Sequence, residues 1–398
     1  MTITNNSSFN RTLGIYIHIP FCVKKCAYCD FLSFENESEK IHRAYVKALI
    51  KEIEAYALIY GDKYTVDSVF IGGGTPSLLL PGMIYDVIRA VKSEFNVAVN
   101  AEITIEANPG TLTGAKPEYY HNAGINRLSL GAQSFNDRIL EILERVHIAG
   151  DISKHYKTAR ESGFENINID LIFGIPGQNL DIWKETLDRA LGLDPEHISF
   201  YGLQIEQGTK LFNMIEAGEY REIPDESDRE MYHYTIKELK SSGYSHYEIS
   251  NAAKAGYECR HNLKYWSMDD YLGVGLGAHS YIGGMRFGNT KDLDEYVERN
   301  LKRSSDMLEH EKVWEFFHEN SASDDISEYM FTGLRMMKGV SLKDFERRFG
   351  RRIKDAYSVE WPAIERYIAD GLLILDYERL KLSEKGIDIS NRIMSEFV

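Results

Sequence analysis

The sequence predicts an α/β protein, in which an open, mostly parallel sheet is followed by a small helical, winged-helix-like C-terminal domain. Short apolar runs alternate with amphipathic helical patterns over much of the 398-residue chain. Strands that alternate with helices need crossover connections and therefore form a parallel sheet. Six such units are too few for a closed eight-stranded barrel, but they can curl into an open one. Near the C-terminus, helical patterns surround two short strands, which is typical of a winged helix.

The strands of the sheet are predicted from short apolar or alternating runs at residues 15–19, 68–71, 102–107, 127–130, 166–173 and 197–203. Helical patterns fill most of the intervals, at residues 40–59, 83–95, 136–162 and 180–191. The first of these helices shows the i, i+3, i+4, i+7 spacing of an amphipathic helix. Polar residues and glycines follow several strands, where parallel α/β folds place their functional sites.

The segment from residue 205 to 292 is less regular. One strong helical pattern covers residues 225–242, and a glycine-rich stretch covers residues 271–279. This stretch lacks the Lys-Ser/Thr ending of a phosphate loop and does not join a strand to a helix, so a nucleotide site is only weakly indicated. The polar stretches 289–305 and 321–325 are predicted to be linkers.

The C-terminal unit is predicted to begin near residue 327. Helices are expected at residues 328–337, 341–349, 358–370 and 385–396, with strands at 372–375 and 380–382. A basic run from Arg347 to Lys354 could contact nucleic acid, although a solvated helix face explains it equally well. The chain is therefore divided into a flexible N-terminus (1–12), a sheet domain (13–204), a connecting segment (205–320) and a C-terminal domain (321–398).

Composition and charge argue against several classes of protein. The formal net charge of −15 argues against general nucleic-acid binding, which needs clustered positive charge. The first residues are polar and lack the apolar core of a signal peptide. No apolar run approaches the roughly 20 residues that a membrane span needs. Four cysteines, three of them close together, do not make a disulfide framework. We therefore expect a cytoplasmic protein without a membrane span.

Three of the four cysteines lie in one short stretch. Cys22, Cys26 and Cys29 are close neighbours, and only Cys259 lies elsewhere. Three thiolates at this spacing suit one face of an iron–sulfur cube, which usually has four protein thiolates, so one iron would stay open to a small molecule. A zinc site with a fourth ligand from elsewhere and three unrelated thiols are the alternatives that the spacing leaves open.

The residues around the cysteines resemble the radical S-adenosylmethionine superfamily. Tyr-Ile-His-Ile-Pro-Phe precedes Cys22, and Asp-Phe follows Cys29. Within the superfamily, the chain is similar to the branch of oxygen-independent coproporphyrinogen III oxidases and HemW-type haem chaperones. The resemblance implies a partial (β/α)6 barrel with a [4Fe–4S] cluster on Cys22, Cys26 and Cys29 at its C-terminal mouth. It also implies that S-adenosylmethionine chelates the fourth iron, and that flavodoxin or ferredoxin donates electrons.

The resemblance also assigns residues at the strand ends to S-adenosylmethionine. The methionine side would be lined by Tyr16, the backbone of Tyr28, Gly73, Gly74 and Thr75. Glu106 and Arg145 resemble the residues that hold the amino and carboxylate groups, since a zwitterion needs one group of each sign. Gln133 and Asp170 resemble those that reach the ribose hydroxyls, which favour amide or carboxylate acceptors. Residues 174–177 resemble the loop near adenine. Each carboxylate on its own is also explained as a helix cap or salt-bridge partner.

Two features distinguish the members of this branch. Coproporphyrinogen oxidases have a further cysteine where this chain has Phe31, and a longer region before the cluster than the 21 residues here. The stretch from His261 to Trp266 reads His-Asn-Leu-Lys-Tyr-Trp and matches the H-N-x-x-Y-W motif of the HemW-type group. The match implies that His261, Tyr265 and Trp266 contact haem b, because histidine ligates haem and aromatic rings give it a flat apolar surface.

Alternatives remain for this motif and for the function. A hydrogen-bonded histidine is the structural alternative for His261, and Cys259 and His279 are weaker haem-ligand candidates. We expect a HemW-type haem chaperone that binds the cluster, S-adenosylmethionine and haem, and delivers haem to an apo-haemoprotein of respiration. The alternatives are a coproporphyrinogen III oxidase, which converts propionates to vinyls, and another radical enzyme that acts on a tetrapyrrole.

Overall fold

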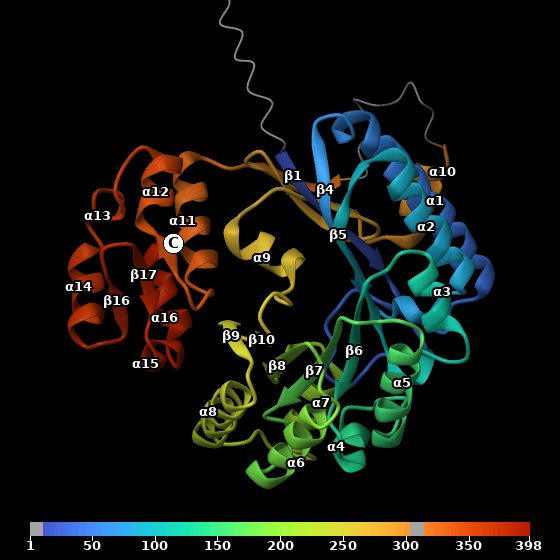
Figure 1. The fold of residues 1–398 in the computed structure, drawn as a ribbon, viewed down its shortest axis with the longest axis horizontal. Coiled ribbons are helices and arrows are strands. Elements are labelled where there is room, and N and C mark those ends of the chain that lie inside the picture. Colours follow the sequence, from blue (N-terminus) through green and yellow to red (C-terminus); the bar gives the residue numbers. More distant parts are fainter. Residues whose placement is uncertain (1–10, 303–313) are drawn as a thin grey trace, which may run out of the picture.

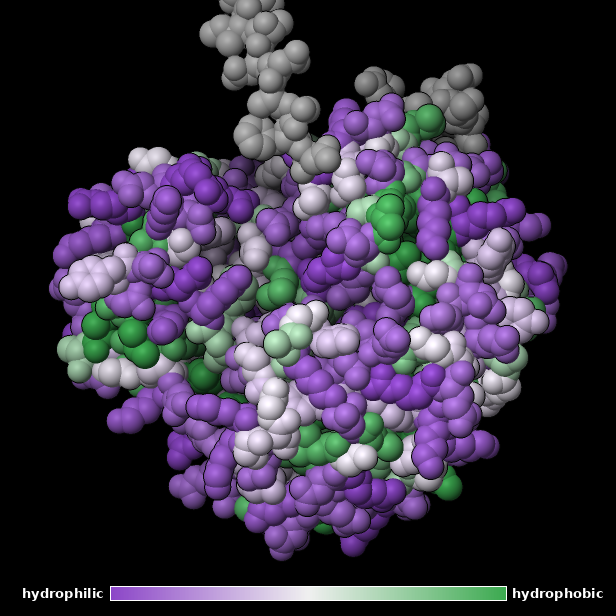
Figure 2. All heavy atoms as spheres, viewed as in Figure 1, coloured by the Kyte–Doolittle hydropathy of each residue, from purple (hydrophilic) through white to green (hydrophobic). Residues whose placement is uncertain are grey.

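The computed structural model describes residues 11–302 and 314–398 (Figure 1). The predicted flexible N-terminus lies outside the described residues, except for its last two residues, which already belong to strand β1 (Arg11–Ile19). In the described parts of the chain, no helix combines the length and apolar character needed to cross a membrane. The face shown in Figure 2 is mainly hydrophilic, with hydrophobic residues in small groups.

Six parallel strands form the centre of one large sheet, in the same order as along the chain. They are β1, β4 (Tyr64–Gly73), β5 (Asn96–Ala107), β6 (Arg127–Gln133), β7 (Ile167–Phe173) and β8 (His197–Gly202). Every neighbouring pair is parallel. Each crossover therefore moves the chain one strand along the sheet, which curls it into an open barrel. The predicted α/β fold with a parallel sheet is confirmed, and the sheet ends at β14 and β9 without closing.

Helices connect these strands along the outer side of the curved sheet (Figure 1). They are α1 (Glu39–Tyr60), α2 (Pro81–Glu94), α3 (Lys116–Asn122), α4 (Asp137–Ile142), α5 (Ala149–Glu161) and α6 (Leu180–Leu191). The single helix predicted over residues 136–162 is wrong, because the chain leaves α4 and Glu144 adopts a φ of 53°. That left-handed conformation interrupts a right-handed helix.

The segment after β8 extends the sheet at both ends. Beyond β8 lie β10 (Asn251–Ala253) and β9 (Ser245–Glu248). On the other side, β11 (Tyr271–Val274) pairs in parallel with β1, and three antiparallel strands follow: β12 (His279–Ile282), β13 (Met285–Asn289) and β14 (Trp314–Glu319). The sequence analysis missed these strands. Those from β9 to β13 have only three to five residues, which is too few for a clear alternating pattern. The predicted helix is present as α8 (Asp225–Ser241).

The glycine-rich stretch forms the turn between β11 and β12. Gly275 has a φ of 102°, and a Cβ there would lie 2.7 Å from the backbone oxygen of His18 and from the Tyr45 hydroxyl. The Gly275 N–H donates to the buried Glu52 carboxylate at 2.7 Å. Glycine is therefore required at this position for close packing behind β1. The stretch joins two strands, whereas a phosphate loop joins a strand to a helix.

Helix α9 (Arg260–Ser267) lies on the inner side of the curved sheet (Figure 1). Glu102 of β5 accepts a hydrogen bond from the His261 N–H at the start of α9 (3.2 Å). Lys264 forms an ion pair with Asp67 of β4 (2.9 Å). Because Asp67 lies near the beginning of β4, α9 covers the N-terminal end of the open barrel.

The C-terminal unit has an apolar core of its own. Its helices are α11 (Ala322–Gly333), α12 (Leu342–Phe349), α13 (Ile353–Ala356), α14 (Trp361–Ala369), α15 (Glu384–Ile387) and α16 (Ser390–Met394). They surround a sheet of β15 (Val340–Ser341), β17 (Arg379–Leu382) and β16 (Leu373–Leu375). This arrangement confirms the predicted helical C-terminal region. The division of the chain at residues 204 and 320 remains a prediction.

Three predicted details of the C-terminal unit and of the segment before it are wrong. Residues 321–325 are not a linker, because the Ser321 hydroxyl accepts from the Asp324 N–H (3.2 Å) and so begins α11. The predicted linker 289–305 contains α10 (Leu293–Lys302), and its last three residues lie outside the described chain. The single helix predicted over 385–396 is divided into α15 and α16.

The C-terminal unit contacts α9 directly. The Arg335 guanidinium lies 4.5 Å above the Trp266 ring, and Arg348 donates to the backbone oxygen of Met268 (3.0 Å) at the end of α9. Three other residues of the predicted basic run pair with acidic neighbours: Arg347 with Asp344, Arg352 with Asp355, and Lys354 with Glu365. Helix α9 is thus held between the barrel and the C-terminal unit.

Candidate functional site

The three cysteines lie on the loop that follows β1. The loop is closed where β2 (Phe21–Cys22) pairs with β3 (Phe34–Glu35). At its centre, the Ala27 N–H donates to the backbone oxygen of Leu143 (3.1 Å), and the Ala27 carbonyl accepts from the Leu211 N–H (2.7 Å). The loop is therefore fixed to two other segments. Cys22 is buried, and Cys26 and Cys29 are half-buried.

Two polar side chains donate hydrogen bonds to cysteine sulfurs. Arg145 Nη1 lies 3.2 Å from Cys26 Sγ, and Thr75 Oγ1 lies 3.5 Å from Cys22 Sγ. Arg145 Nη2 also donates to the backbone oxygen of Gly131 (2.8 Å). Burial raises the pKa of Cys22 and raises that of Cys29 to about 11, which favours thiols in the ligand-free protein. The donors aimed at sulfur act in the opposite direction and would stabilise thiolates bound to a cluster. Among the described residues, no group of three His, Cys, Asp or Glu side chains is placed so that it could hold a single metal ion.

The glycine run after β4 packs against the cysteine loop. The Thr75 N–H donates to the backbone oxygen of Phe21 (2.8 Å). A Cβ on Gly74 would lie 2.8 Å from that same oxygen, and a Cβ on Gly73, which has a φ of 110°, would lie 2.5 Å from the His18 ring. Side chains are excluded at both positions, so these glycines hold the loop close to β4.

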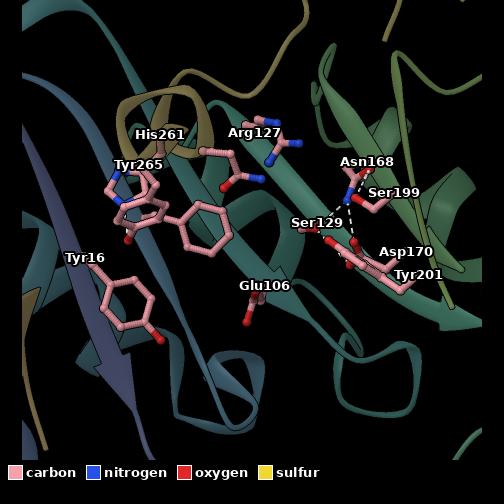
Figure 3. A pocket seen from close by; sticks show the side chains of 12 residues that line it. Tyr16, Glu106, Arg127, Ser129, Asn168, Asp170, Ser199, Tyr201, His261 and Tyr265 are labelled. Carbon is pink, nitrogen blue, oxygen red and sulfur yellow. Dashed lines mark hydrogen bonds between the residues drawn. The ribbon is translucent and has the colours of Figure 1, made fainter. Parts of the chain in front are cut away.

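A cavity of about 170 Å³ lies inside the barrel, with α9 as one wall (Figure 3). Residues from all six parallel strands line it together with α9: Tyr16, Phe70, Glu106, Arg127, Ser129, Asn168, Asp170, Ser199, Tyr201, His261, Asn262 and Tyr265. Five predicted site residues from distant parts of the chain meet here, namely Tyr16, Glu106, Asp170, His261 and Tyr265.

The other predicted residues gather beside the cysteine loop instead of lining the cavity. Gln133, at the end of β6, has a φ of 63°. Its amide and the Arg145 guanidinium both lie within 3.4 Å of where a Cβ on Gly131 would be. Tyr28 and Arg145 lie close enough to interact electrostatically. Gln133, Arg145 and Tyr28 therefore form one group near Cys26.

Glu106 projects into the cavity from the end of β5 (Figure 3). Its Oε2 accepts from the Gly73 N–H (3.1 Å). Burial, and secondly the nearby Asp170 carboxylate, raises the pKa of Glu106 to about 8. The carboxyl group is therefore mostly protonated at pH 7 in the ligand-free protein, and a ligand ammonium group would favour its ionised form.

This raised pKa predicts a pH-dependent stability. Between the ordinary pKa of 4.5 and the folded-state value of about 8, the folded protein holds more protons than the unfolded chain, so Glu106 reduces stability as the pH rises. We expect Glu106→Gln to raise the melting temperature of the ligand-free protein more at pH 8 than at pH 5. Thermal denaturation of the variant beside a surface control, Glu118→Gln, tests this. Equal shifts at both pH values would contradict it.

Asp170 is held by a network on one face of β6 and β7. It accepts from Ser129 Oγ (2.9 Å) and from Asn168 Nδ2 (2.7 Å), and Asn168 also donates to Ser129 (2.7 Å). His197 lies 2.6 Å from the Asn168 side-chain oxygen. The sequence analysis missed these supporting residues. The available signal was the two-residue spacing of polar side chains within otherwise apolar strands.

Helix α9 places two of the three predicted haem residues on the cavity. His261 Nδ1 lies 3.0 Å from Ser68 Oγ, and its Nε2 lies 2.9 Å from the Tyr265 hydroxyl. Both ring nitrogens are therefore hydrogen-bonded within the protein. Burial, followed by nearby cationic side chains, lowers the pKa of His261 to about 3, so the ring is neutral at pH 7. Trp266 lies outside the cavity lining and contacts Arg335.

The two weaker haem-ligand candidates do not line the cavity. Cys259 Sγ lies 3.6 Å from Glu102 Oε1. Burial raises the pKa of Cys259 to about 12, so this residue remains a thiol. His279 lies on β12, with its ring centroid 6.4 Å from that of Phe316.

The chain matches two family models and resembles a solved structure. The model of the radical SAM superfamily matches residues 16–190, and that of the HemN C-terminal domain matches residues 320–389. The structure of coproporphyrinogen III oxidase (HemN) from Escherichia coli superposes with a TM-score of 0.83 over 98% of this chain and 90% of that chain. The two are 24% identical, so this likeness shows a shared fold.

Closer relatives carry the name Heme chaperone HemW. The protein from Bacillus subtilis is 37% identical over 96% of this chain and 98% of its own length. That from Lactococcus lactis is 32% identical over 96% of each chain, and that from Escherichia coli is 36% identical over 77% of this chain and 81% of its own. Similarity of this extent includes the barrel, α9 and the C-terminal unit, and the chain belongs to the HemW family of the radical SAM superfamily.

Proposed function

We propose that this protein is a cytoplasmic haem chaperone that binds a [4Fe–4S] cluster, S-adenosylmethionine and haem, and delivers haem to respiratory haemoproteins. One observation carries the proposal: the cavity inside the barrel is lined both by Glu106 and Asp170 and by His261 and Tyr265 of α9. The name of the HemW relatives supports haem as the cargo.

The cysteine loop has the chemistry to hold the cluster. Cys22, Cys26 and Cys29 would bind three irons as thiolates and leave the fourth open. The hydrogen bonds from Arg145 and Thr75 to sulfur would offset the negative charge of the thiolates. A bound cluster supplies single electrons to S-adenosylmethionine, with flavodoxin or ferredoxin as the proposed source.

S-adenosylmethionine fits the polar residues that lie next to this loop. Glu106, placed by the Gly73 N–H, would lose its proton and hold the ligand amino group. Arg145 would face the ligand carboxylate. Asp170 is already oriented by Ser129 and Asn168, so it would accept from the ribose hydroxyls without reorganisation.

Haem would contact α9 at His261 and Tyr265. The Nε2 lone pair is available to iron only when the Tyr265 hydroxyl, 2.9 Å away, moves aside. The cavity of about 170 Å³ is smaller than the roughly 300–1,000 Å³ of pockets that enclose drug-sized ligands. Haem binding at His261 therefore requires α9 to shift, and the C-terminal unit that holds α9 would shift with it or release it.

The proposed function predicts haem transfer without coproporphyrinogen oxidation. We expect the anaerobically reconstituted protein to bind haem and pass it to an apo-haemoprotein, as followed by haem absorbance. The double variant His261→Ala/Tyr265→Ala should bind haem more weakly with its iron content unchanged, because it loses an axial ligand and a stacking surface. His279→Ala, outside the cavity, is the control.

The oxidase alternative gives the opposite result in the same samples. The position of the oxidases' further cysteine is occupied here by Phe31, whose side chain is exposed. Anaerobic conversion of coproporphyrinogen III to protoporphyrinogen IX would overturn the chaperone proposal.

A further inference from the structure

The cavity contains a cation that the site described above leaves unused. Arg127, the first residue of β6, is only 2% exposed and lines the cavity (Figure 3). Within the described residues it forms no hydrogen bond or ion pair, and its buried Nε has no partner. Burial of a guanidinium with no ion-pair partner costs free energy, and nearby acidic groups offset this cost only through space, because they raise the pKa of Arg127 without bonding to it. An anion bound in the cavity would supply the direct partner that Arg127 lacks.

The carboxyl groups around Arg127 are already engaged elsewhere. Glu102 and Asp170 act on its charge through space, and so does Glu106. However, Glu106 accepts from the Gly73 N–H. Glu102 accepts from the N–H groups of Arg260 and His261 at the start of α9. Asp170 accepts from Ser129 and from the neighbouring amide on β7. Within the described residues none of these three groups forms an ion pair with Arg127, so a ligand anion in the cavity could contact it directly.

We propose that Arg127 binds a carboxylate of the cargo, which in haem is the end of a propionate arm. This inference rests on the proposed function and identifies the part of haem that the cavity recognises. A volume of about 170 Å³ holds a short carboxylate arm, although it does not enclose the macrocycle. His261 lines the same cavity, so the ring nitrogen and the cation would act on one molecule.

The carboxylate of S-adenosylmethionine is a different anion, bound at a different place. Arg145 is bonded to Cys26 and to the backbone of Gly131. Arg127 precedes Gly131 by four residues on β6, and at roughly 3.3 Å per residue their Cα atoms lie about 13 Å apart. S-adenosylmethionine that chelates the cluster would place its carboxylate near Arg145, beside the cysteine loop. Arg127 would then remain available to bind a carboxylate of the cargo.

The experiment compares haem with haem dimethyl ester, which lacks both propionate charges. The wild type is expected to bind haem about tenfold or more tightly than the ester, since the ester cannot form a charge-assisted hydrogen bond with Arg127. Arg127→Met should weaken haem binding to the level of the ester and leave ester binding unchanged. Arg127→Lys should retain part of the difference, because it keeps the charge. Arg138→Met, an exposed position on α4, is the control.

Three further measurements separate the possible failures. We expect Arg127→Met to match the wild type in iron content and in affinity for S-adenosylmethionine. Its melting temperature should be equal to that of the wild type or higher. Equal wild-type affinities for haem and ester would overturn the role of Arg127 while the chaperone proposal stands. Failure to bind either compound would overturn the chaperone proposal itself. Weaker S-adenosylmethionine binding, or loss of iron and stability, in Arg127→Met would assign Arg127 to the cofactor site or to the fold.

Discussion

Replacing any one of Cys22, Cys26 and Cys29 with alanine is expected to reduce bound iron from about four atoms per chain to almost none. The reason is that a cube held by three thiolates has no spare ligand. Cys259→Ala should keep its iron, because this thiol is buried beside Glu102. Iron and sulfide analysis after anaerobic reconstitution measures the effect.

Two other results would change the interpretation of the cysteine loop. Loss of iron in Cys259→Ala would indicate four cysteine ligands and no vacant iron for S-adenosylmethionine. Stoichiometric zinc in the protein as purified, with no cluster formed on reconstitution, would support the zinc alternative.

The second large effect is expected at the two carboxyl groups of the cavity. Asp170→Asn and Glu106→Gln should each weaken S-adenosylmethionine binding by about tenfold or more, since each replaces a charged acceptor with a neutral amide. At position 170 the loss is increased because Ser129 and Asn168 donate to the carboxylate, and an amide accepts only through its oxygen.

Equilibrium binding to protein of matched iron content measures this effect. Asp86→Asn, at an exposed position on α2, should bind like the wild type. If both cavity variants also bind like the wild type, S-adenosylmethionine lies elsewhere and the site is misplaced.

The central fold could be predicted from sequence because its strands are long and separated by amphipathic helices. The helix α6 was predicted with its bounds, and the sheet was predicted to be parallel and open. The strands at the sheet ends could not be found, since β10 and β11 have only three and four residues. Their pairing depends on β8 and β1, which are remote in sequence.

The site residues were predicted in two ways. The cysteines were predicted from their motif, and the roles of Glu106 and Asp170 were predicted from the family resemblance and their place in successive strands. Arg127 was missed because it lies at the start of a strand, where an arginine normally reaches solvent. In the fold it is buried on a cavity that α9 helps to line, and the position of α9 depends on contacts such as Lys264 with Asp67.

The pairing of β1 with β11 has a consequence for how the protein matures during translation. Strand β4 leaves the ribosome soon after β1, whereas β11 follows only after β8, α8 and α9 have been made. Until then, one edge of β1 keeps unpaired backbone groups, and that strand leads directly into the cysteine loop. A nascent chain therefore carries its cysteine loop on an unfinished support, so the proposed cluster would be inserted more readily after synthesis of the barrel is complete.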